Sequence, residues 1–131
     1  MNILDENIVT SQRAQLQKWR IRFSHISTDF GRQGMKDLAE IIPLLHRSRR
    51  PTFFTHDLGF FDPVLCHKDY SVVCLDVNAK ETAVYIRRFL RHPGFRTQKQ
   101  RLGKVILARQ RNLSFWEIGN QELQRLGWPK P

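Results

Sequence analysis

Apolar and polar residues follow two spacings along this chain, and together the two spacings predict alternating strands and helices. Nearly continuous apolar runs at residues 51–55 and 71–77 are typical of strands that are covered on both faces. Apolar residues recur at helical spacing elsewhere, most clearly over residues 79–91. Because strands and helices alternate through residue 77, we expect an α/β fold, a three-layer α/β/α sandwich with a mainly parallel sheet.

The same patterns give the bounds of the remaining elements. Strands are predicted at residues 2–5, 20–26, 51–55, 71–77, 104–108 and 113–118, and helices at 8–19, 37–46 and 79–91, with a short helix within 60–66. Residues 27–34 read as a loop, and Pro43 is expected to kink the second helix. The last two strands would form a hairpin added at a sheet edge. We therefore predict a single domain over residues 1–131, with a core at 2–91 and a basic hairpin region at 92–120.

The charge balance points to a polyanionic partner. The 131 residues include 22 Lys and Arg against 12 Asp and Glu, a formal net charge of +10. Nucleic acid suits that excess best, while an anionic membrane surface or an acidic protein are the alternatives. The chain has no apolar run near the roughly 20 residues that cross a bilayer, and its start lacks signal-peptide features. With Cys66 and Cys74 read as reduced thiols, we expect a cytoplasmic protein with no membrane contact.

Three acids stand where the predicted elements would gather them. Asp5 and Asp57 each follow a short apolar strand, and Asp37 opens the second helix. Parallel strands end at a shared edge, so these carboxylates would enter one crevice, where Mg²⁺ or Mn²⁺ would find oxygen ligands. The alternative is that each acid only caps a helix, and Asn7 could cap the first one.

The order of these motifs resembles a known family. Ile3-Leu4-Asp5-Glu6-Asn7, the helix-opening Asp37 and Thr55-His56-Asp57-Leu58-Gly59-Phe60 are similar to segments of the compact PIN-like proteins, relatives of the VapC-type toxin ribonucleases. The resemblance spans residues 2–77. It implies that Asp5, Asp37 and Asp57 bind Mg²⁺ or Mn²⁺ and are catalytic in RNA cleavage. It also implies a small cognate antitoxin protein and a homodimer.

One position departs from the family pattern. The family often has a second acid where this chain has Gly59. Without that acid, the metal site has one carboxylate fewer unless another carboxylate reaches the metal. The weaker candidates for that role are Glu6, Glu40, Asp62 and Asp76.

The C-terminal half carries the candidate RNA-binding residues. No Asp or Glu occurs from Thr82 to Trp116, whereas Arg and Lys are frequent there. Helix-dipole effects near a last turn do not explain bases spread over this length, and phosphate neutralisation does. Phe95, beside Pro93 and Gly94 in a loop, is expected to be an exposed ring that stacks on bases. The residues assigned to RNA backbone contact are Arg87, Arg88, Arg91, Arg96, Lys99 and Arg101.

The five histidines show no spacing typical of metal ligands. Four are interpreted as structural or surface residues, and His56 stands out only because it precedes Asp57. The resulting hypothesis is a metal-dependent endoribonuclease, the toxin of a type II toxin–antitoxin pair. The rivals are a non-catalytic nucleic-acid-binding module and a basic protein-interaction subunit on the same fold.

Overall fold

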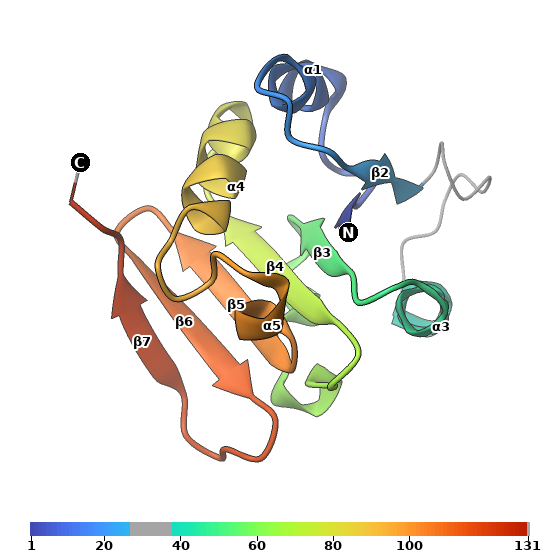
Figure 1. Cartoon of the computed structure of the whole chain (residues 1–131), viewed down its shortest axis with the longest axis vertical. Coiled ribbons are helices and arrows are strands. Elements are labelled where there is room, and N and C mark those ends of the chain that lie inside the picture. The colour runs from blue at the N-terminus through green and yellow to red at the C-terminus, as the bar shows by residue number, and fades with distance from the viewer. Residues whose placement is uncertain (27–37, 131) are drawn as a thin grey trace.

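Seven strands pair into one sheet in the computed structural model, which describes residues 1–26 and 38–130 (Figure 1). The strand order is β2-β1-β3-β4-β5-β6-β7. The first five strands in this order are parallel, and β6 and β7 are antiparallel additions. The strands are β1 Asn2–Leu4, β2 Ser24–His25, β3 Thr52–Thr55, β4 Ser71–Asp76, β5 Lys104–Arg109, β6 Asn112–Glu117 and β7 Gln124–Gly127. The predicted α/β class with a mainly parallel sheet is confirmed.

Helices cover both faces of this sheet. The α-helices of the described ranges are α1 Thr10–Lys18, α3 Leu38–Arg47, α4 Thr82–Leu90 and α5 Gln98–Arg101, and single 3₁₀ turns occupy Leu58–Phe60, Pro63–Leu65 and Ala79–Glu81. The long helices agree with the predicted ones, and α3 contains Pro43. The predicted loop at 27–34 lies outside the described residues.

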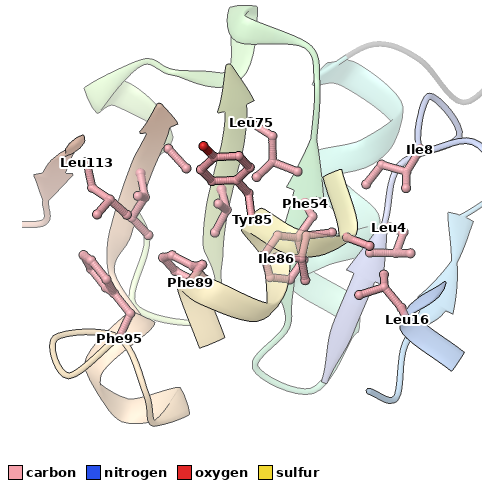
Figure 2. Close-up of a cluster of buried hydrophobic side chains, with 14 residues drawn as sticks. Leu4, Ile8, Leu16, Phe54, Leu75, Tyr85, Ile86, Phe89, Phe95 and Leu113 are labelled. Carbon is pink, nitrogen blue, oxygen red and sulfur yellow. The ribbon is translucent and has the colours of Figure 1, made fainter. Parts of the chain in front are cut away.

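Alternate side chains of each parallel strand enter opposite cores, as the two-residue period of a strand requires. On one face, Phe54 of β3 and Val73 of β4 join the cluster formed by α1 and α4, part of which Figure 2 shows. On the other face, their neighbours Phe53 and Val72 pack with Ile41 of α3. Both faces of the central strands are therefore buried, which explains their continuous apolar sequence. The arrangement is compatible with a three-layer sandwich.

The helices α1 and α4 lie side by side on the same face, and Ala83 N of α4 donates to Gln12 Oε1 of α1 at 2.9 Å (Figure 1). The crossover through α1 runs from β1 to β2, and the crossover through α4 runs the other way along the sheet, from β4 to β5. The two crossovers thus have opposite hands, an exception to the strong right-handed rule. Because each helix follows a strand of the parallel part of the sheet, the N-termini of both helices lie at the carboxyl edge of the sheet.

The strand order also fixes a switch point between β1 and β3. From β1 the chain moves outward to β2, then returns through α3 to β3 on the other side of β1. Crevices of open α/β sheets form at such a switch point, outside the carboxyl ends of the strands. Asp5 and Asp57 directly follow this pair of strands.

Three local predictions need correction. The strand expected at 20–26 is only two residues long, because Arg20 adopts φ 61° and the Ile21 N–H donates to Leu16 O, which closes the end of α1. The predicted hairpin is not added outside the core. Its first strand, β5, pairs in parallel with β4 and buries Val105 and Ile106, so the core extends beyond residue 91.

The third correction concerns the chain end. No strand was predicted after residue 118, but Gln124–Gly127 form β7, which pairs with β6. Trp128 packs on Tyr85 of α4 and donates its Nε1 hydrogen to Arg109 O at 2.7 Å. None of the helices in the described ranges has the length and apolar character needed to cross a membrane.

Candidate functional site

Asp5 is a buried carboxylate at the end of β1, with only 3% of its surface exposed. Its Oδ1 accepts the Glu6 N–H at 2.8 Å, and its Oδ2 accepts the Thr55 hydroxyl at 2.6 Å and Asn7 Nδ2 at 3.3 Å. Burial raises the pKa of Asp5, and the charges of Glu6 and Asp57 raise it further, whereas the hydrogen bonds from Thr55 and from Glu6 N lower it. The side chain is thus held in place by donors while its ionised form is destabilised by its surroundings.

Thr55 links Asp5 to Asp57. β1 and β3 pair in register with Leu4 opposite Phe54, so Asp5 comes opposite Thr55 at the ends of their strands. The Thr55 hydroxyl donates to Asp5 and also accepts the Asp57 N–H at 2.9 Å. One buried hydroxyl therefore sets the positions of both acids.

Asp57 itself is exposed, and its Oδ1 caps the following 3₁₀ turn by accepting Gly59 N–H at 2.9 Å. Both roles considered for Asp57, metal ligand and cap, are thus compatible with the structure, since Asp57 caps a turn and also lies beside Asp5. A Cβ atom at Gly59 would lie 3.0 Å from Asp57 Oδ1. A side chain at position 59 would crowd this carboxylate unless the turn shifted.

His56 and Asn7 adjoin Asp5 and Asp57 at this edge of the sheet. The His56 ring turns away from the acids, with Nδ1 3.0 Å from Leu75 O and Nε2 2.8 Å from Thr82 Oγ1, so it joins the end of β4 to the start of α4. Asn7 does not cap α1, whose N-cap residue is Val9. Its amide bonds instead to Asp5, to Thr55 and, through Oδ1, to the His56 N–H.

The other candidate acids are dispersed. Asp37 lies outside the described residues. Glu6 is adjacent to Asp5 and half-buried, Asp62 caps the 3₁₀ turn at Pro63–Leu65, and Glu40 lies in α3 on the other face. Asp76 ends β4 and pairs with Arg109, Oδ2 to Nε, at 3.4 Å.

The predicted RNA-binding arginines of α4 cluster around aromatic rings. Arg87 lies 3.6 Å from the centroid of the Trp19 ring, and Arg88 lies 4.5 Å from that of Trp128. Beside them is an open groove of about 620 Å³, lined by Val84, Arg87, Arg88, Arg91, Pro129 and Lys130. Cation–π attraction to the indole rings holds the guanidinium groups of Arg87 and Arg88 at these positions.

Two of the predictions for the following loop are wrong. Arg101 is buried, because its Nε donates to Thr52 Oγ1 at 2.9 Å and its Nη1 to Phe95 O and Arg96 O, so it supports the loop from inside. Burial lowers the pKa of Arg101. Phe95 is fully buried against Phe89 and does not offer a stacking surface. Arg96 and Lys99 are exposed.

A second group of possible metal ligands lies at the opposite edge of the sheet. Among the residues that the structure describes, one set of three His, Cys, Asp or Glu side chains has all its ligand atoms within 4.8 Å of one another. That set is His46, His67 and Asp69. The sequence analysis did not predict this set, because His46 and His67 come from distant segments with no ligand spacing between them.

Sequence reasoning also missed Thr55 as a site residue. The signal was available in part, since Thr55 ends a strand predicted to lie in the sheet, but the register with β1 was needed to place it against Asp5.

No protein-family model, curated protein or solved structure matches this chain.

Proposed function

We propose that this protein is a metal-dependent endoribonuclease whose site is the crevice between β1 and β3. One observation carries the proposal. Asp5 and Asp57 lie at the carboxyl ends of adjacent parallel strands, at the switch point of the sheet, and are joined through the Thr55 hydroxyl.

The residues of the crevice fit Mg²⁺ or Mn²⁺. Mg²⁺ is often held by one or two carboxylates and keeps several waters, so Asp5 and Asp57 suffice as protein ligands. Asp57 contributes to the raised pKa of Asp5, which indicates that the two charges interact. A bound cation would relieve both that repulsion and the cost of burying Asp5. Asp37 remains a predicted third ligand.

The metal, when bound, would activate a water and stabilise charge on the phosphodiester. Neighbouring residues of the chain orient the carboxylate oxygens that would bind the metal. Thr55 and Glu6 N–H fix the Asp5 oxygens, and the hydrogen bond from Gly59 N–H fixes Oδ1 of Asp57. Positioning of this kind keeps the ligand oxygens from rearranging during the reaction.

Charge around the crevice suits an RNA strand. The helix α1 has no acid in its first turn, so the positive end of its dipole is not neutralised there, whereas Glu81 stands at the N-cap of α4. Thr82, at the start of α4, contacts His56 beside Asp57. Arg87 follows five residues later, about 7.5 Å along the helix axis. A strand bound at Asp57 could therefore continue along α4 onto the groove at Arg88 and Arg91.

Restraint by an antitoxin is part of the same proposal. A ribonuclease of this kind, if it acts as the toxin of a pair, requires a small partner that covers the acidic crevice or the basic groove. A homodimer and a cytoplasmic location remain predictions of the family resemblance and of the composition.

The test is cleavage of labelled single-stranded RNA with Mn²⁺, with Mg²⁺ and with EDTA. Asp57→Asn is the key variant, because an asparagine can still accept Gly59 N–H and so removes the charge while keeping the cap. Asp5→Asn is the second variant, and Glu122→Gln, which removes an exposed charge between β6 and β7, is the control. We expect cleavage by wild type and by Glu122→Gln only with metal, and none by either Asp variant.

Retained RNA binding without cleavage in any metal would overturn the nuclease proposal. It would favour the non-catalytic nucleic-acid-binding module, for which Gly59 in place of an acid is the supporting observation. Absence of salt-dependent RNA binding would favour the protein-interaction subunit instead.

A further inference from the structure

The side chains of His46, His67 and Asp69 converge at the amino edge of the sheet. His46 lies in the last turn of α3, which leads to β3, and His67 and Asp69 lie in the loop that leads to β4. Because β3 and β4 pair in parallel, with Thr52 opposite Ser71, the two approaches to these strands lie next to each other. This edge is opposite to the one that carries Asp5 and Asp57.

The spacing of the three side chains suits one metal ion. Their ligand atoms lie within 4.8 Å of one another, and His67 Nδ1 is 3.7 Å from Asp69 Oδ2. Two ligands of a tetrahedral Zn²⁺, each at 2.0–2.1 Å, are about 3.3 Å apart. Since His46 and Asp69 are exposed, small side-chain rotations can close the remaining difference without disturbing the core.

Neighbouring groups hold His67 in an orientation suited to coordination. Its ring stacks on Tyr70, with centroids 5.4 Å apart and planes 10° from parallel. Tyr70 is itself fixed by its hydroxyl, which donates to Leu65 O at 2.6 Å. The Asp69 N–H donates to His67 Nδ1 at 3.1 Å, so Nδ1 is the unprotonated ring nitrogen in this arrangement. An imidazole binds a metal through an unprotonated nitrogen, and an ion at Nδ1 would take the place of this hydrogen bond.

His46 approaches the same point from the helix. Its ring meets the His67 ring edge-on, with centroids 4.3 Å apart, and lies 5.3 Å from the Tyr70 ring. Two imidazoles that are brought so close at an exposed edge, with a carboxylate beside them, have the chemistry of a site for a borderline divalent metal.

We propose that His46, His67 and Asp69 bind a divalent transition-metal ion of the Zn²⁺ class. The ion joins the end of α3 to the loop before β4. Imidazole ligands separate this site from the oxygen-only crevice at Asp5, which suits Mg²⁺ or Mn²⁺. Three protein ligands leave one position of a tetrahedral ion for water or an exogenous ligand. The proposal is independent of the nuclease function and of the acids at the other edge.

The test is titration of the full chain with Zn²⁺ by calorimetry and with Co²⁺ by visible absorption, which reports low-coordinate nitrogen and oxygen ligation. We expect one Zn²⁺ per chain in Asp57→Asn, which lacks one acid of the other site, and an ion of the same affinity in wild type and in the neighbouring control Lys68→Ala. Affinity should fall more than about tenfold in His46→Ala, in His67→Ala and in Asp69→Asn, a loss that removal of even an outer-shell group can cause.

Thermal unfolding supplies a second readout. Zn²⁺ should raise the unfolding temperature of wild type and of Lys68→Ala but not of His46→Ala, which removes an exposed helix residue and should fold normally. Equal Zn²⁺ affinity in wild type and His46→Ala, or loss of the ion in Asp57→Asn alone, would overturn the proposal.

Discussion

Replacement of Thr55 by valine tests how the crevice is held together. The change exchanges a buried hydroxyl for a methyl group of similar size, so it opens no cavity. It removes the hydrogen bond to the Asp5 carboxylate at 2.6 Å and the acceptor for Asp57 N–H at 2.9 Å. A hydrogen bond to a charged group contributes about 1.5–3 kcal/mol and a neutral one about 0.5–1.5 kcal/mol. We expect a loss of about 2–4 kcal/mol in the free energy of unfolding.

The loss should depend on pH with a definite sign. Burial raises the pKa of Asp5 in the folded chain, so folding favours its protonated form and stability falls as pH rises through that pKa. The Thr55 hydrogen bond lowers this pKa, so its removal raises the pKa further. The stability difference between wild type and Thr55→Val should therefore widen toward neutral pH and narrow in acid.

The assay is urea unfolding between about pH 4 and pH 7, the interval above the ordinary carboxyl range. Thr55→Ser is the matched control, because it keeps the hydroxyl and removes one methyl group, at a cost of about 0.8 kcal/mol. A Thr55→Val variant as stable as Thr55→Ser, with a difference from wild type that does not change with pH, would refute the role of Thr55 in holding Asp5.

Four further predictions concern the rest of the chain. Arg101→Met should cost about 3 kcal/mol of stability, since three hydrogen bonds from a buried guanidinium are lost, and leave RNA affinity unchanged. Arg91→Ala should leave stability unchanged and weaken RNA binding, and it should reduce the salt dependence of binding by about one phosphate contact. Burial raises the pKa of Cys74 to about 12, so its thiol should resist alkylation until the protein unfolds, and Cys66 should react first. Phe95→Ala should cost about 3–5 kcal/mol in chemical unfolding, as for a core ring.

The central sheet could be predicted because its strands are buried on both faces. Phe53 and Phe54 enter opposite cores, as do Val72 and Val73, and this leaves a continuous apolar run that a sequence reader recognises. The ends of such strands can be predicted from the same apolar runs. The hydrophobic pattern alone therefore predicts that Asp5 and Asp57 lie at the same edge of the sheet.

Tertiary contacts determine the features that the hydrophobic pattern of the sequence does not predict. Phe95 follows Pro93-Gly94, a local signal for an exposed turn, but its N–H bonds to His92 O and the turn folds the ring back onto Phe89. Arg101 looked like one base among many, and only the packing of its loop against Thr52 shows that it is internal. His46 and His67 meet because their two segments lead to paired strands.

The central claim is that Asp5 and Asp57 together hold a divalent cation at the switch point of the sheet. Electron paramagnetic resonance of Mn²⁺ tests it directly, because bound Mn²⁺ loses the sharp signal of the free ion. Titration of wild type, Asp57→Asn and His46→Ala separates the acidic crevice from the histidine site. We predict one bound Mn²⁺ in wild type and in His46→Ala that disappears in Asp57→Asn. Equal Mn²⁺ binding by wild type and Asp57→Asn would contradict the account.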